Sequence, residues 1–282
     1  MRKITTLFTL ILASVLVASA QSQVKQFSLK SKLLGVKKNY SVYLPDGYDK
    51  SGEKYPVLYL LHGAKGNHFS WLEEKRGNMQ EIADKAIAAG GAKPMIIVMP
   101  NASGEGEKNA GKNMGYFDVE GWPYMEFFFE EFIPHIDKTF RTIASKDGRA
   151  IAGLSMGGGG AFVYAQRHPE IFGAAYSTSG LLDHRYRPTI PDYYDIGWLY
   201  SVAQTSPVEY LRNATAEEIE KLRSVRWMLD CGDDDRIIFT NIDFFLEMKR
   251  ENVPVELRIR NGKHNWAFWR KSLPGILKFA FR

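Results

Sequence analysis

The strongest chemical signal in the sequence is a serine between two glycines, because residues 153–157 read Gly-Leu-Ser-Met-Gly. A strand-like run over 149–152 precedes this motif, and a helical pattern that ends before Pro169 follows it. In a Gly-x-Ser-x-Gly motif the serine occupies a tight turn from strand to helix, where larger flanking side chains would collide with nearby backbone. The positive end of the helix points at the serine and favours negative charge there. The motif therefore predicts that Ser155 is a nucleophile.

A serine hydroxyl is a weak nucleophile at its ordinary pKa, so a histidine must take its proton. In α/β-hydrolases, the fold in which this motif occurs, an acidic residue and then a histidine follow the serine along the chain. His168, His184 and His264 satisfy that order. His168 ends the helix after the serine and suits a helix C-terminus, while His184 lies in a long insertion. His264 follows the last predicted strand in a glycine-containing loop, and we predict that it is the base.

Several aspartates follow the predicted strand over 226–229, and they are Asp230, Asp233, Asp234 and Asp235. Because like charges at such proximity cannot all be buried and ionised, we expect one to turn inward toward His264 and the others to face solvent. The residues alone leave that choice open. A calcium-binding loop is the alternative interpretation of this acidic run, although it has no matching downstream glutamate.

The negatively charged oxygen that forms during attack needs two backbone N–H groups as hydrogen-bond donors. Met156 supplies one because it directly follows the serine. Ala64 is the candidate for the other because it follows His62 and Gly63 at the end of the first buried strand. We interpret His62 as a structural residue, since it lies upstream of the serine and next to this glycine.

Hydrophobic periodicity predicts a single domain over 21–282 with a mostly parallel central sheet and helices on both faces, as in the α/β-hydrolase fold. Alternating patterns predict two antiparallel strands at the start, and short apolar runs predict buried parallel strands after them. The predicted strands are 26–32, 38–44, 57–61, 95–99, 149–152, 174–177, 226–229 and 255–259. The predicted helices are 79–89, 124–139, 158–167, 216–222, 240–251 and 273–281.

Two connections, 101–121 and 181–224, are too long to be simple turns. Long loops in such a fold usually build the site above the carboxyl ends of the strands. We predict that aromatic side chains near the base and in these loops contact the substrate, although ordinary packing would explain them as well. The predicted substrate contacts are Tyr116, Phe117, Trp198 and Trp266, and Tyr193, Tyr194, Tyr200 and Trp269 are further aromatic residues of these regions.

Composition and the N-terminus limit the class of protein. With 282 residues, 45% hydrophobic and 24% charged, the chain has the composition of an ordinary globular protein rather than a disordered one. A net charge of +5, dispersed along the chain, does not favour a nucleic-acid partner. Arg2 and Lys3 precede an apolar run that ends in Ala-Ser-Ala at 18–20, which predicts a signal peptide over 1–20, cleavage before Gln21 and a secreted or periplasmic protein. A retained anchor is the alternative, and we expect the single cysteine, Cys231, to be a buried, inert thiol.

Several short stretches together resemble a known esterase family. They are 41–48 (SVYLPDGY), 60–63 (LLHG), 132–137 (FIPHID), 153–157 (GLSMG), 231–232 (CG) and 264–266 (HNW). From about residue 26 to its C-terminus the chain resembles bacterial feruloyl esterases and acetyl xylan esterases, which are related to esterase D and the mycobacterial mycolyltransferases. In that family the acid usually closes a Gly-x-x-Asp turn, which falls here on Asp235, and the oxyanion donors fall on Ala64 and Met156.

The resemblance implies a secreted serine esterase that removes feruloyl or acetyl groups from plant xylan without a metal or organic cofactor. An acyltransferase with the same three residues is one alternative, since it differs only in whether water or a sugar hydroxyl accepts the acyl group. An alternative of another class is a non-catalytic protein that binds carbohydrate on a hydrolase scaffold. The presence of Ser155, Asp235 and His264 together argues against that second alternative.

Overall fold

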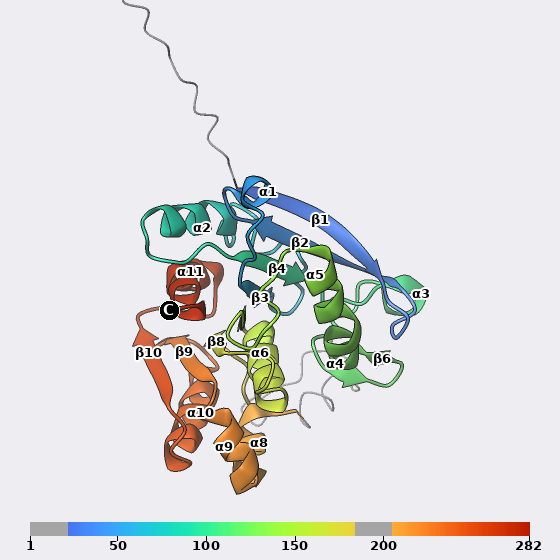
Figure 1. The fold of residues 1–282 in the computed structure, drawn as a ribbon. Coiled ribbons are helices and arrows are strands. Elements are labelled where there is room, and N and C mark those ends of the chain that lie inside the picture. Colours follow the sequence, from blue (N-terminus) through green and yellow to red (C-terminus); the bar gives the residue numbers. More distant parts are fainter. Residues whose placement is uncertain (1–21, 184–204) are drawn as a thin grey trace, which may run out of the picture.

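The computed structural model describes residues 22–183 and 205–282, and an eight-stranded sheet lies at its centre (Figure 1). The strand order is β1-β2-β4-β3-β7-β8-β9-β10. β1 pairs with β2 and β2 with β4 in antiparallel orientation, and the pairs from β4 onward to β10 are parallel. The strands are β1 Gln23–Lys30, β2 Lys37–Leu44, β3 Val57–Leu61, β4 Ile96–Pro100, β7 Arg149–Leu154, β8 Ala174–Thr178, β9 Arg226–Gly232 and β10 Val255–Arg260. The predicted antiparallel edge and mostly parallel sheet are confirmed.

The central strands read as continuous apolar runs because both faces of the sheet are buried. In β3, Val57, Tyr59 and Leu61 enter one hydrophobic core, while Leu58 and Leu60 enter the other. Helices α2 and α11 close the second core, and they lie side by side in Figure 1. The first core is closed by the helices α4 to α6 and by α8 to α10.

The predicted helices agree with observed ones over most of their lengths, but three short helices, at 48–51, 106–109 and 207–213, were not predicted. The observed helices are α1 Tyr48–Ser51, α2 Met79–Ala88, α3 Gly106–Asn109, α4 Tyr124–Phe127, α5 Ile133–Thr139, α6 Met156–Arg167, α8 Pro207–Asn213, α9 Ala216–Leu222, α10 Ile238–Arg250 and α11 Trp266–Ala280. A π-helical turn, η1 Phe128–Phe132, joins α4 to α5 within the single helix predicted over 124–139. The long connection 101–121 is not structureless, since it holds α3 and leads into the short hairpin of β5 Asp118–Val119 and β6 Trp122–Pro123.

The start predicted for the last helix was wrong. Instead of beginning at Leu273, α11 begins at Trp266, directly after Asn265. The Asn265 side chain accepts a hydrogen bond from the backbone N–H of Phe268 at 3.1 Å and so caps the helix. Pro274 lies inside the helix rather than at its start. Proline removes one backbone donor, but the buried apolar face of α11 compensates for that loss through tertiary packing.

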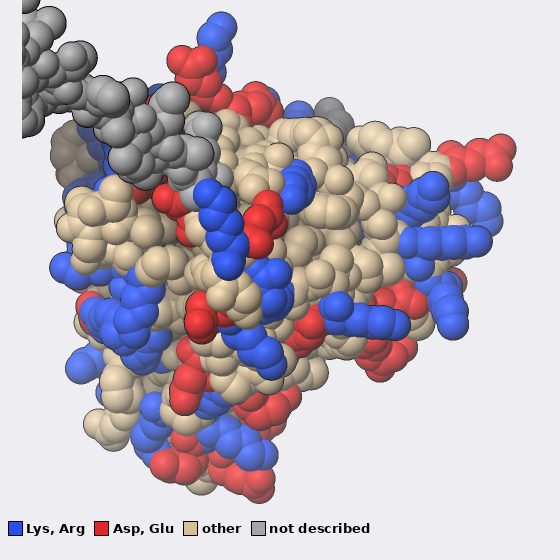
Figure 2. All heavy atoms as spheres, turned by 45° about the horizontal axis from the view of Figure 1, so that its top comes forward, with Lys and Arg blue, Asp and Glu red and all other residues tan. Residues whose placement is uncertain are grey.

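Three further features of the described residues are the distribution of surface charge, the hydropathy of the helices and the burial of the single cysteine. On the face drawn in Figure 2, basic and acidic side chains are intermixed. Within 22–183 and 205–282, no helix is long and apolar enough to cross a membrane. The predicted burial of Cys231 is confirmed, and this burial raises the pKa of its thiol. The predicted signal peptide lies outside the described residues.

Candidate active site

Ser155 occupies the turn between β7 and α6 in a backbone conformation that residues other than glycine rarely adopt, with φ of +53°. The flanking glycines make this turn possible. A Cβ atom on Gly153 would lie 2.3 Å from the carbonyl oxygen of Gly157, and a Cβ atom on Gly157 would lie 2.5 Å from the carbonyl oxygen of His62. The backbone N–H of Ser155 donates to the Thr178 carbonyl at 3.0 Å. These contacts fix the turn and present the Ser155 hydroxyl at the carboxyl end of the sheet.

His264 connects Ser155 to Asp235. Its Nε2 lies 2.9 Å from Ser155 Oγ, and its Nδ1 lies 2.9 Å from each carboxylate oxygen of Asp235. A carboxylate only accepts hydrogen bonds, so Nδ1 carries the proton and Nε2 is free to accept the serine hydroxyl proton. The ring of Trp269 packs edge-on against His264 with 5.0 Å between ring centroids. This is the arrangement that the nucleophile, base and acid of a serine hydrolase require.

Asp235 is 2% exposed at the turn after β9. Burial raises the pKa of its carboxyl, but the hydrogen bond and charge of His264 and the backbone N–H of Ile237 together lower that pKa below its usual value. Asp235 is therefore ionised at neutral pH although it is buried. An ionised carboxylate at this position orients the imidazole and stabilises its positive charge after proton transfer.

The other three aspartates of this run have different partners. Asp230 is buried and forms a two-pronged ion pair with Arg260, at 2.9 and 2.6 Å. Asp233 is exposed and accepts the backbone N–H of Gly262 at 2.9 Å, which anchors the loop before His264. Asp234 is exposed. Of the four, Asp235 is the one in hydrogen-bond contact with His264, but the expectation that all the others face solvent was wrong for Asp230.

The two candidate oxyanion donors flank Ser155. Met156 is the first residue of α6, and Ala64 follows β3 on the neighbouring strand of the sheet. A Cβ atom on Gly63 would lie 3.5 Å from Ser155 Cβ, so the chain next to Ala64 approaches the serine closely. Among the hydrogen bonds of the described residues, none uses the N–H of Ala64 or of Met156. Neither N–H group therefore has a hydrogen-bond partner among residues 22–183 and 205–282.

A cleft of about 330 Å³ opens over Ser155 and His264. Ala64, Trp266 and Trp269 contribute to its wall. Its described lining also includes the basic residues Lys65, Arg76 and Arg236 and no acidic side chain. A larger hollow of about 700 Å³ lies at the opposite end of the strands, near Tyr55, Pro94 and Gly148, away from these groups.

The basic residues of the cleft were not predicted from the sequence. Lys65 and Arg236 each directly follow a residue predicted to belong to the site, and that adjacency was the available signal. Arg76 had no such signal, because it lies between β3 and α2 and reaches the cleft only through the fold. Arg76 also pairs with Glu73 at 2.9 Å.

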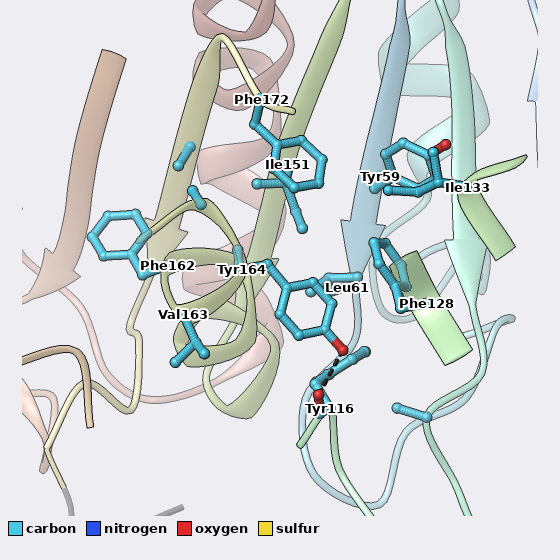
Figure 3. Close-up of a cluster of buried hydrophobic side chains, with 14 of the residues drawn as sticks. Tyr59, Leu61, Tyr116, Phe128, Ile133, Ile151, Phe162, Val163, Tyr164 and Phe172 are labelled. Carbon is cyan, nitrogen blue, oxygen red and sulfur yellow. Dashed lines mark hydrogen bonds between the residues drawn. The ribbon is translucent and has the colours of Figure 1, made fainter. Parts of the chain in front are cut away.

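The aromatic residues predicted to contact substrate lie in different parts of the structure. Trp266 lines the cleft, and Trp198 lies outside the described residues. Tyr116 and Phe117 are 0% and 3% exposed, and Figure 3 places Tyr116 within the hydrophobic core beside Tyr164. The hydroxyl of Tyr164 donates to the backbone carbonyl of Tyr116 at 2.5 Å. The prediction for Tyr116 and Phe117 was therefore wrong, because rings enclosed by core residues cannot stack on an acyl group.

The sheet order, the strained serine turn and the histidine beyond the last strand define an α/β-hydrolase. The sequence model of the family described as "Putative esterase" matches residues 31–280, and the chain belongs to that family. A solved structure of a ferulic acid esterase is 42% identical with a TM-score of 0.87, covering 93% of this chain and 98% of that one.

Two relatives add to this comparison. An endo-1,4-beta-xylanase/feruloyl esterase of Xylanibacter ruminicola is 40% identical over 154 residues, which is 53% of this chain but only 20% of that protein. An acetyl esterase of Caldicellulosiruptor saccharolyticus is 26% identical over 278 residues, which is 91% of this chain and 97% of that protein. The chain thus spans a small part of the first relative and nearly all of the second.

Proposed function

We propose that the protein is a serine carboxylic ester hydrolase that removes feruloyl or related hydroxycinnamoyl groups from xylan or its oligosaccharides. The observation that carries the proposal is the continuous chain of hydrogen bonds from Ser155 through His264 to buried Asp235 at the floor of an open cleft. The 42% identity to a ferulic acid esterase over nearly the whole chain supports the acyl group.

The geometry supports a two-stage reaction. Ser155 Oγ attacks the ester carbonyl while its proton passes to His264 Nε2, and the N–H groups of Ala64 and Met156 stabilise the oxyanion. His264 then returns the proton to the departing alcohol oxygen, which leaves an acyl group on Ser155. Water attacks the acyl-enzyme while its proton passes to His264. Collapse of the second oxyanion breaks the bond to Ser155 Oγ, which takes the proton back from His264, and releases the acid. Each residue named here needs no metal for its role.

We propose as well that the protein is exported from the cell. An ester on a plant polysaccharide lies outside the cell, and the charged, apolar and small-residue regions of 1–20 suit a cleavable signal peptide. A secreted or periplasmic enzyme would meet that substrate or the oligosaccharides released from it.

The first experiment compares hydrolysis of methyl ferulate and p-nitrophenyl acetate by the protein that begins at Gln21, with Ser155→Ala as the control. We expect ferulate release with kcat lowered by roughly 10⁶-fold in Ser155→Ala. Acetate release without ferulate release would favour an acetyl esterase, for which the Caldicellulosiruptor relative is the supporting observation. Transfer of the acyl group to added sugar in excess of free acid would favour the acyltransferase alternative. Turnover that persists in Ser155→Ala, or none with either ester, would contradict the proposal.

A further inference from the structure

His62 is a second histidine at the carboxyl end of the sheet, and it is 1% exposed directly after β3. Both of its ring nitrogens have backbone partners. The N–H of Ala102 donates to Nε2 at 2.9 Å, and Nδ1 lies 2.8 Å from the carbonyl oxygen of Gly63. A backbone N–H can only donate, so Nε2 is unprotonated and the proton of the neutral ring is on Nδ1. His62 Nδ1 therefore donates to Gly63.

The carbonyl of Gly63 and the N–H of Ala64 belong to one peptide group. The described peptide bonds are all trans, so this carbonyl and this N–H point in opposite directions. The carbonyl is held by His62 Nδ1 and also accepts the N–H of Gly66 at 3.0 Å. Fixing the carbonyl inward leaves the N–H of Ala64 pointing the other way, and Ala64 lines the cleft beside Ser155.

The His62 ring, its backbone and the surrounding loops are held in place by hydrogen bonds and close packing. The backbone carbonyl of His62 accepts the hydroxyl of Tyr116 at 3.0 Å. Ala102, whose N–H holds Nε2, is 0% exposed. Ser103 Oγ donates to the carbonyl of Gly66 at 2.7 Å, which joins the loop after β4 to the loop after β3 a second time. A Cβ atom on Gly66 would lie 2.9 Å from His62 Nδ1, so the loop closes tightly around the ring.

We propose that His62 is a positioning residue for the oxyanion hole, because its Nδ1–H orients the Gly63–Ala64 peptide so that the Ala64 N–H faces the carbonyl oxygen of the substrate. His62 itself touches neither the substrate nor Ser155 in this role. The inference rests on the proposed function, since it assigns to Ala64 the donor that the esterase reaction requires. It replaces the general structural role predicted for His62 with a specific one.

Two substitutions separate the two hydrogen bonds of the ring. In His62→Asn, the side-chain amide nitrogen sits near the Nδ1 position and keeps a donor for Gly63, but the acceptor for Ala102 is lost. In His62→Gln, the amide oxygen reaches the Nε2 position and accepts from Ala102, but the donor for Gly63 is lost. His168→Gln is the matched control, because His168 ends α6 away from the cleft and pairs with Glu170 at 3.2 Å.

For His62→Gln we expect kcat on methyl ferulate to fall by roughly 10²-fold with little change in KM, as for the loss of one oxyanion donor. The affinity for a boronic acid that forms a tetrahedral adduct with Ser155 should fall by a similar factor. His62→Asn should recover at least part of that kcat although it lowers Tm, and His168→Gln should match the wild type. Equal losses in both His62 variants that follow Tm, or a His62→Gln enzyme with wild-type kcat, would overturn the inference.

A measurement on the wild-type protein covers the case in which the variants do not fold. Nitrogen-15 NMR of labelled histidine should show His62 as the neutral Nδ1–H tautomer between about pH 5 and pH 8. An Nε2–H tautomer would contradict the inference. If the wild type hydrolyses no ester, the proposed function fails, whereas the tautomer and the boronic acid adduct still test the role of His62.

Discussion

Two histidines at the carboxyl ends of the strands each have two hydrogen-bond partners, but the partners differ in whether they can exchange a proton. His62 follows β3, and its partners are the Gly63 carbonyl and the Ala102 N–H. His264 follows β10, and its partners are the Asp235 carboxylate and the Ser155 hydroxyl. The hydrogen bonds are 2.8 to 2.9 Å long in both cases, and both rings carry their proton on Nδ1.

The difference lies in what the partners can do with a proton. A backbone amide neither gives up its proton nor takes one at neutral pH, so His62 is locked in one protonation state. Burial is the main reason that the pKa of His62 is lowered to about 4. In the proposed reaction, the Ser155 hydroxyl releases its proton to His264, and Asp235 stabilises the resulting positive charge. The identity of the partners, rather than the residue type or the bond lengths, separates a fixed support from a base.

Within this comparison of the two histidines, the largest expected effect comes from giving His264 a neutral partner, as His62 already has. In Asp235→Asn the amide no longer stabilises a positive imidazole and can favour the wrong tautomer, so we expect kcat on methyl ferulate to fall by about 10⁴-fold. Asp233→Asn is the control, because asparagine keeps the oxygen that accepts the Gly262 N–H. Steady-state kinetics of both variants check this, and a larger loss in Asp233→Asn would assign the acid to that residue.

The next effect concerns stability in acid. Below pH 6.5 His62 takes up a proton in the unfolded chain, but in the folded protein it does so only near pH 4. Above pH 6.5 His62 is neutral in both states and does not make the free energy of unfolding depend on pH. As the pH drops from 6.5 toward 4, the free energy of unfolding falls. The integrated loss is about 3 kcal/mol for His62. Burial also lowers the pKa of His68 to about 4, and that residue contributes with the same sign.

Urea unfolding between pH 4 and pH 7 measures this effect. In His62→Asn the free energy of unfolding should depend less steeply on pH over this range than in the wild type, even though its value at pH 7 is lower. Since His68 is unchanged in that variant, its share of the slope should persist. Identical slopes in the two proteins would show that His62 takes up its proton in the folded state near its ordinary pKa.

The smallest effect concerns the wall of the cleft beside His264. Trp266 packs edge-on against Trp71 and Trp269, with 5.4 Å between ring centroids in both pairs, and it lines the cleft. If its ring contacts an aromatic acyl group, Trp266→Ala should raise KM for methyl ferulate by about tenfold and KM for p-nitrophenyl acetate much less. Trp266→Phe should keep most of the affinity. Equal changes for the two esters would show that Trp266 only supports the packing of the wall.

Most of the sheet could be predicted from the sequence because each buried strand is a run of a few consecutive apolar residues. Val57–Leu61 was predicted without error, and β4 and β8 differ from the prediction by one residue at one or both ends. The start of α11 was missed because Pro274 is unfavourable inside an isolated helix. Packing of the Phe268 to Leu277 face on the sheet outweighs that local preference, and packing depends on residues far away in the chain.

The chain alone determined the serine turn and the order of the reactive residues, because glycines on both sides of Ser155 and a histidine after the last strand are local features. Only the tertiary structure decided which groups meet. It brought Asp235 to His264 across 29 positions and Ala102 to His62 across 40, and it enclosed Tyr116 in the core. Hydrogen bonds act over about 3 Å in space, so a pattern along the chain can suggest their members but cannot pair them.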